Sequence, residues 1–179
     1  LWASQFLPNR VRTFLFQYFN NSIAVGARTA ARYRNVGNYI DQSCTFCVKA
    51  GQGVALRETF RHLFIDCYAM SGVINSFFRM YFEADFNCND AESRLFKATG
   101  YRSDMTGTDQ FFSFITISLL NFMTWQYKLR RCIPSLATLS SDVATLFGTI
   151  ATVNSVHEVA LTSQSFVCRQ WRSNGHRRG

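Results

Sequence analysis

Three cysteines and one histidine follow one another at spacings that suit a single metal ion. They are Cys44, Cys47, His62 and Cys67, in the pattern C-x2-C-x14-H-x4-C. Two cysteines separated by two residues can direct both sulfurs to one ion at about 2.3 Å from a tight turn. Three thiolates and one imidazole supply the four ligands that tetrahedral zinc prefers. The sequence therefore predicts a closed, structural Zn²⁺ site with no open position for hydrolytic water.

A second interpretation of these residues needs no metal. The two cysteines of the first pair would pack in a loop, while His62 and Cys67 would face a helical core. A lone CxxC is common, and the added H-x4-C favours zinc. Glu58 and Asp66, each about one turn from His62, are candidates to hold its free imidazole nitrogen. The remaining cysteines have no ligand-like spacing and are interpreted as ordinary residues: Cys88, Cys132 and Cys168.

The apolar residues recur mostly at three- and four-residue steps, which is the spacing of one face of an α-helix. Of the 179 residues 47% are hydrophobic, with 18 phenylalanines and only 2 prolines. Many large apolar rings and few helix breakers favour packed helices over a flexible chain. No alternating pattern is strong enough to predict a sheet. We therefore expect a mainly α fold, a helical domain with an inserted CCHC zinc knuckle.

Helices are predicted over residues 8–19, 27–33, 57–82, part of 91–108, 109–129 and 141–153. We expect a break at Ser71 and Gly72, and a last helix capped by Ser141 and Asp142. Residues 35–56 hold five glycines or asparagines and are predicted as loops. The chain then divides into an N-terminal helical arm (1–40), a zinc knuckle (41–70), a helical bundle (71–157) and a basic tail (158–179).

The longest apolar stretch, residues 111–123, is interrupted by polar residues and is shorter than the ~20 residues that span a bilayer. We expect a core helix there and no membrane partner. The first residues lack a basic segment followed by an apolar run, so we expect an intracellular, reducing location in cytoplasm and nucleus. Because the chain starts at Leu1, we expect it to be a piece of something longer.

The net charge of +8 is concentrated at the two ends of the sequence. Residues 1–61 carry eight Lys/Arg and two acids, residues 128–179 seven and two, but residues 62–127 four and seven. RNA or DNA would be attracted to the basic ends. The candidate nucleic-acid contacts are Arg28, Arg32, Arg34, Lys49, Arg57 and Arg61. Phe46 is either a stacking ring or a local core residue, and the arginines are alternatively solvated helix faces.

The metal-ligand segments resemble a known family. The runs Cys44-Thr-Phe-Cys47 and Glu58-Thr-Phe-Arg-His62-Leu-Phe-Ile-Asp-Cys67 resemble the zinc-binding segment downstream of the reverse transcriptase domain in LINE-type (non-LTR) retrotransposon polyproteins. In that family a cysteine pair is followed by the phrase E-T-x-x-H-L-F-x-x-C. Residues 19–28 and 125–134 also resemble the family, so the likeness covers about residues 1–135 in outline. The x14 spacer is longer than the family's usual one.

The resemblance implies an accessory role in handling template RNA or target DNA, with the upstream reverse transcriptase domain as a partner. No Tyr/Phe-x-Asp-Asp element of a polymerase is present in the sequence, and no nucleophile and base share a catalytic signature. We therefore expect no enzymatic activity from this chain. The alternative is a zinc-stabilised structural or protein-interaction domain that docks on the rest of the polyprotein, which the phenylalanine content favours.

Overall fold

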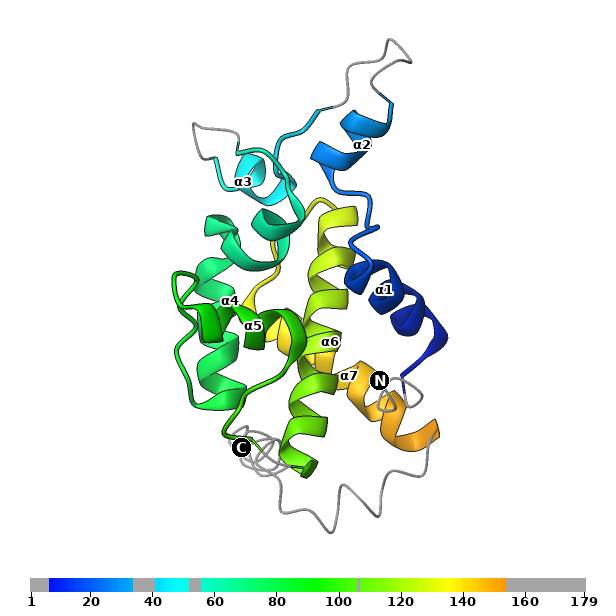
Figure 1. The fold of residues 1–179 in the computed structure, drawn as a ribbon, viewed down its shortest axis with the longest axis vertical. Coiled ribbons are helices and arrows are strands. Elements are labelled where there is room, and N and C mark those ends of the chain that lie inside the picture. The colour runs from blue at the N-terminus through cyan, green and yellow to red at the C-terminus, as the bar shows by residue number, and fades with distance from the viewer. Residues whose placement is uncertain (1–6, 34–40, 52–55, 106, 154–179) are drawn as a thin grey trace.

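The computed structural model describes residues 7–33, 41–51, 56–105 and 107–153, and these form a mainly α fold, as the apolar spacing predicts (Figure 1). The α-helices are α1 (Asn9–Phe19), α2 (Gly26–Arg32), α3 (Thr45–Lys49), α4 (Tyr68–Phe82), α5 (Ala91–Thr99), α6 (Gly107–Leu129) and α7 (Leu136–Val153). One turn of π-helix, η2 (His62–Asp66), precedes α4. The β structure of the described residues is a single antiparallel bridge between Ser43 and Arg57.

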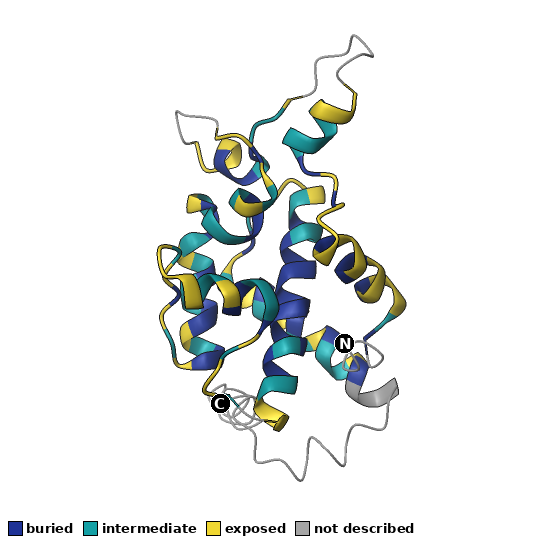
Figure 2. Cartoon of the chain, in the orientation of Figure 1, coloured by how far each residue is buried: buried dark blue, intermediate teal, exposed yellow. Residues whose placement is uncertain are grey.

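Helix α6 forms the centre of the fold, and α1, α5 and α7 contact it (Figure 1). It is buried around most of its circumference between Phe112 and Thr124, as the dark stretch in Figure 2 shows. A helix that is surrounded by others must be apolar on every face. This position explains the long apolar stretch at residues 111–123 without a bilayer. Within the described residues, none of the helices combines the length and apolar character that crossing a membrane requires.

The segment between residues 58 and 82 differs from the predicted helix with a break at Ser71 and Gly72. Helix α4 runs through both residues without interruption, so that prediction is wrong. The interruption lies at Cys67, whose φ of -66° and ψ of 109° are extended. The apolar spacing continues across Cys67 because the segments before and after it both face the core. Periodicity therefore detected the buried face but not the change of direction at Cys67.

Helix α7 begins five residues before the predicted cap at Ser141 and Asp142. The residue before its first turn is Ser135, whose Oγ accepts a hydrogen bond from the Thr138 N–H at 3.1 Å. Asp142 has a different role, because its Oδ2 accepts a hydrogen bond from the Tyr127 hydroxyl at 2.5 Å. This contact joins α7 to the last turn of α6. The predicted basic tail, residues 158–179, lies outside the described residues.

Helices α5 and α6 pack closely around Gly100 and the buried Lys97. Gly100 has a φ of 71°, and a Cβ there would lie 2.6 Å from the Phe114 Cα, so only glycine fits. Lys97 is 1% exposed, and its Nζ donates to Asn121 Oδ1 at 2.5 Å. Asn121 in turn donates through Nδ2 to the Lys97 carbonyl at 3.1 Å. Burial lowers the pKa of Lys97 to about 7.

We predict that Lys97→Met stabilises the protein, and that the gain depends on pH. The unfolded chain binds a proton at Lys97 up to about pH 10, whereas the folded chain releases it near pH 7. Below pH 7 both states are protonated and burial of the charge penalises the parent protein by up to about 5 kcal/mol. The free energy of unfolding of the parent should therefore rise towards that of the variant between pH 7 and pH 10.

Urea unfolding of both proteins across this range, at one saturating metal concentration, checks the prediction. Lys49→Met is the matched control because Lys49 is exposed at the end of α3. Its difference from the parent should be small and flat with pH. A Lys97→Met difference that does not change between pH 7 and pH 10 would contradict the assigned cause.

Candidate metal centre

The four residues of the C-x2-C-x14-H-x4-C pattern meet in one place. Cys44, Cys47, His62 and Cys67 each offer one ligand atom, and these atoms all lie within 4.8 Å of one another. Cys44 precedes α3, Cys47 lies within it, His62 opens η2 and Cys67 precedes α4. The three cysteines are buried and free of disulfides. This group could hold one metal ion, because the four side chains converge on one place.

Two distances between the cysteine sulfurs match those of a tetrahedral metal site. Cys67 Sγ lies 3.8 Å from both Cys44 Sγ and Cys47 Sγ. In a tetrahedral site, metal–sulfur bonds of about 2.3 Å place two sulfurs about 3.8 Å apart. His62 Nε2 lies 3.3 Å from Cys47 Sγ, so this nitrogen faces the cluster. The long x14 spacer is therefore compatible with four ligands around one centre.

The π-helical turn explains how His62 and Cys67 can share an ion. Residues five apart on a regular α-helix are rotated by about 140°, so their side chains point in different directions. The wider turn of η2 reduces this rotation, because π-helices close their hydrogen bonds over five residues. The extended backbone of Cys67 then directs its sulfur back towards His62. Helical periodicity cannot predict this local change, although the H-x4-C spacing requires one.

The three thiols have different pKa values because they share one small volume. The pKa of Cys44 falls to about 4, chiefly because the Cys67 thiol donates a hydrogen bond to it. The same hydrogen bond, with burial and the charge of Cys44, raises the pKa of Cys67, and burial raises that of Cys47. The protein alone thus favours one thiolate. A divalent cation would allow all three thiols to ionise.

Backbone N–H groups favour thiolates at the same site. The backbone N–H groups of Cys47, Ala69 and Met70 act to lower the pKa values of Cys44, Cys47 and Cys67, respectively. Ala69 and Met70 lie in the first turn of α4, and the Met70 N–H also donates to the Cys67 carbonyl at 3.1 Å. The start of α4 thus supplies donors and the positive end of a helix dipole to the sulfurs.

Glu58 connects the metal ligands to the rest of the fold instead of holding the imidazole of His62. It is 1% exposed, and its Oε1 accepts from the Gly26 N–H at 2.9 Å. Its Oε2 accepts from the N–H and the hydroxyl of Thr45, both at 3.4 Å. Lys128 completes the arrangement with a Glu58 Oε1 to Nζ distance of 3.2 Å. One carboxylate therefore joins the first turns of α2 and α3 to the last turn of α6.

The second candidate partner of His62 is also engaged elsewhere. Asp66 Oδ2 forms a salt bridge with Arg61 Nε at 2.5 Å, and Asp66 Oδ1 has no hydrogen-bond partner among the described residues. Both carboxylate predictions are therefore wrong. The spacing to His62 suggested them, but Glu58 lies before η2 and turns towards α2 and α3, while Asp66 bonds along its own turn.

The predicted nucleic-acid contacts occupy several positions around the metal ligands. Lys49 is exposed at the end of α3, Arg57 in the β-bridge, and Arg61 beside η2. On α2, Arg32 is exposed, whereas Arg28 is half-buried and donates to the Ile23 carbonyl at 3.3 Å.

Two further predictions concern Arg34 and Phe46. Arg34 lies outside the described residues. Phe46 is fully buried, so it is a local core residue and the stacking interpretation is wrong. The sequence does not predict the contact of Lys128 with Glu58. Cations are common at helix C-termini, so the position of Lys128 there does not indicate a further partner.

A comparison with known protein families, with curated proteins and with solved structures finds no match for this chain.

We predict that the purified chain binds one equivalent of a divalent metal ion and that His62→Ala or Cys67→Ser removes it. Each substitution deletes one of four ligands whose atoms lie within 4.8 Å. Elemental analysis of the protein gives the stoichiometry, and circular dichroism reports the helicity that disappears with the metal. Cys88→Ser and Cys132→Ser are matched controls outside the cluster and should retain the ion. Equal metal content in all four variants would refute the site.

We predict that Glu58→Gln lowers the free energy of unfolding by about 3 kcal/mol, the usual effect of removing one partner from a buried ion pair. The amide leaves Lys128 without its counter-charge and can accept fewer of the three hydrogen bonds from Gly26 and Thr45. Chemical denaturation of metal-loaded protein measures the change. Glu92→Gln, at an exposed site on α5, should cost less than about 0.5 kcal/mol. Equal effects would show that the Glu58 contacts contribute little.

Proposed function

We propose that this chain is a non-catalytic, zinc-binding, nucleic-acid-associated region of a LINE-type retrotransposon reverse transcriptase polyprotein. In this proposal Zn²⁺ joins Cys44 and Cys47 to His62 and Cys67, and the assembled unit helps the polymerase to hold template RNA or target DNA. The observation that carries the proposal is the convergence of three thiols and one imidazole nitrogen within 4.8 Å of one another.

Zinc is the metal that best fits this donor set. Thiolate sulfur and imidazole nitrogen are the ligands of structural zinc sites, and four protein ligands leave no position for a reacting water. Zinc bound in this way supplies folding free energy, because unfolded chains have no preformed site. Its role is to fix α3 and η2 against the start of α4.

The residues of the phrase that resembles the family each have a structural task at the site. Glu58 joins α2, α3 and α6, and the Thr59 hydroxyl accepts the N–H of His62 at 3.0 Å. Leu63 and Phe64 are buried beneath η2. We call residues 44–67 the metal loop. The motif, residues 58–67, thus accounts for the second part of this loop and not only for its two ligands. This agreement between motif and geometry supports the family assignment.

The charges around the metal loop support an association with nucleic acid. Lys49, Arg57 and Arg61 are exposed on the segments that carry the ligands. Their positions are fixed by the ligand cluster, so phosphates would meet cations on a rigid surface instead of on a flexible tail. Such contacts give affinity that depends on salt and little on base sequence.

A second candidate function, docking on the upstream polymerase domain, is supported by exposed aromatic side chains. Phe16 on α1 is 70% exposed and Tyr68 at the start of α4 is 67% exposed. Each of these side chains offers a docking partner apolar area that is otherwise in contact with water. The two functions are compatible, because a region that positions nucleic acid for a polymerase must also contact it.

We predict that Arg61→Glu weakens the binding of RNA or single-stranded DNA about tenfold at low salt, because it replaces a cation that pairs with a phosphate by a charge that repels it. Arg79→Glu is a matched control. Arg61 and Arg79 are similarly exposed, at 67% and 70%, and each forms a salt bridge with an aspartate. Arg79 lies about 18 Å along α4 from Cys67, at 1.5 Å per residue. Fluorescence anisotropy with labelled oligonucleotides, repeated at several salt concentrations, measures the affinities.

Equally weakened binding in the two variants would show that only net charge matters. The absence of measurable binding by the zinc-loaded parent chain would refute nucleic-acid association altogether. If the isolated chain then aggregates and the upstream polymerase domain, but not RNA or DNA, keeps it soluble, the docking function is the correct one.

A further inference from the structure

A groove of about 510 Å³ lies between α1, α6 and α7, away from the metal ligands. This size falls within the ~300 to 1,000 Å³ that is usual for ligand sites in proteins. Helix α1 contributes Arg10, Thr13, Phe14 and Gln17, and α6 contributes Phe122, Met123, Trp125 and Gln126. Arg130 follows α6, and α7 contributes Asp142, Thr145 and Leu146.

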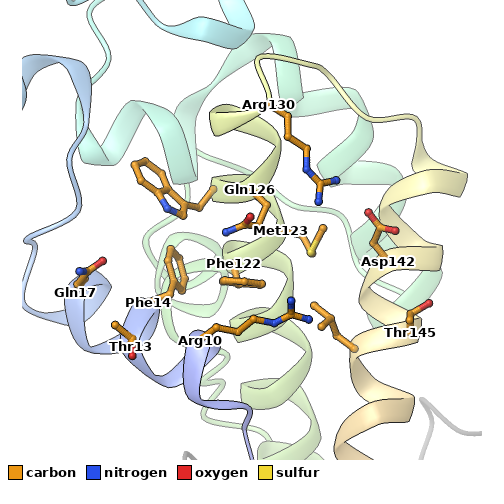
Figure 3. Close-up of a pocket in the computed structure, with 12 residues that line it drawn as sticks. Arg10, Thr13, Phe14, Gln17, Phe122, Met123, Gln126, Arg130, Asp142 and Thr145 are labelled. Atoms are coloured by element: carbon orange, nitrogen blue, oxygen red, sulfur yellow. The ribbon is translucent and has the colours of Figure 1, made fainter.

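Two cations point into this groove from different elements. In Figure 3 the Arg10 side chain extends from α1 across Phe122, and the Arg130 side chain extends from the end of α6 towards Met123 and Asp142. The Arg10 guanidinium lies 5.9 Å from the centre of the Phe122 ring. In the part of the chain that the structure describes, neither arginine forms a salt bridge with an acid. Both are exposed and available to an anion.

The exposed side chains of the groove are polar, and the apolar side chains beneath them are already buried. Phe14, Phe122, Met123 and Leu146 are at most 6% exposed, so little apolar area remains for a hydrophobic peptide to bury. The exposed groups are the two arginines and the side chains of Thr13, Gln17 and Thr145. This composition suits a ligand that is both anionic and rich in hydrogen-bonding groups.

Trp125 supplies an aromatic surface beside these polar groups. It is half-buried on α6, and the Lys128 Nζ lies 4.6 Å from the centre of its ring. Aromatic rings next to arginine and lysine bind the bases of single strands by stacking, at about 1 to 3 kcal/mol per base. The Gln126 amide and the Asp142 carboxylate could bond to base edges, although Asp142 Oδ2 already accepts from Tyr127.

We infer that this groove binds a single strand of RNA or DNA, with phosphates at Arg10 and Arg130 and a base against Trp125. The inference rests on the proposed function and adds a second contact surface to it, separate from the cations of the metal loop. A duplex would reach only the rim, because its bases are stacked inside and its phosphates lie outside. An unpaired strand can turn bases towards Trp125 and Gln126.

The test compares Arg10→Gln/Arg130→Gln with Arg12→Gln/Arg131→Gln in the zinc-loaded full chain. Arg12 and Arg131 are the exposed neighbours of the groove arginines, and neither lines the groove. Both double variants remove two positive charges from nearly the same places, so their long-range fields match. The probes are labelled 12-nucleotide oligo(U) and oligo(dT) and a 12-base-pair duplex.

The groove variant should bind both single strands at least about tenfold more weakly than the parent. Its salt slope should fall by about 1.4, or 0.7 for each phosphate that the protein no longer neutralises. The control variant should stay within about threefold of the parent. The duplex should bind more weakly than the single strands and distinguish the variants less. Thermal unfolding of both variants verifies that the fold is intact.

A second readout locates the strand directly. The chain has three tryptophans, so Trp2→Phe/Trp171→Phe leaves Trp125 as the sole indole reporter. Unlabelled oligo(U) should quench its fluorescence with the same affinity that anisotropy gives.

Equal affinities of the two double variants, or binding without a change at Trp125, would overturn the groove assignment while leaving nucleic-acid association intact. A duplex that binds as tightly as single strands, with the same dependence on Arg10 and Arg130, would refute the single-strand specificity. If the parent binds none of the probes, the proposed function and this inference fail together.

Discussion

The crowding of three cysteine sulfurs into one small buried volume is the constraint on which the arrangement of the site depends. Sulfur atoms 3.8 Å apart in a buried site cannot all carry negative charge unless a cation lies among them. The fold provides what that cation needs, with N–H donors from the start of α4 and an imidazole from η2. A bound cation would join the segments 44–47 and 62–67 to one another, in addition to the core contacts of their buried residues.

The buried carboxylate of Glu58 joins the candidate metal centre to the helical core. Glu58 is joined to the first turns of α2 and α3, while Lys128 brings in the last turn of α6. Lys128 also lies over the ring of Trp125, which lines the groove between α1, α6 and α7. The metal site and the groove are therefore two ends of one continuous set of contacts along α6.

Much of this arrangement is predictable from particular residues. Apolar spacing located α1, α5 and α6 closely, and ligand chemistry identified Cys44, Cys47, His62 and Cys67. Two of the errors share a physical origin, because they concern residues whose role depends on a partner distant in sequence. Asp142 resembles a helix cap until Tyr127 approaches it, and Glu58 resembles a partner for His62 until Gly26 and Lys128 are in place. Local patterns cannot reveal such partners, nor the π turn that the H-x4-C spacing needs.

The pairing of residues 42–44 with residues 56–58 has a consequence for how this sequence can change in length. The Cys44 N–H donates to the Leu56 carbonyl at 2.8 Å and the Glu58 N–H to the Gln42 carbonyl at 2.6 Å, on either side of the bridge between Ser43 and Arg57. Insertions between Gly51 and Leu56 leave the hydrogen bonds of residues 42–44 with residues 56–58 in place, and doubling the length of chain between two fixed ends costs only about 0.6 kcal/mol in closure entropy. Insertion or deletion of one residue between His62 and Cys67 would instead rotate a ligand away from the centre. Length variation among related chains should therefore be tolerated between Gly51 and Leu56 and excluded between His62 and Cys67.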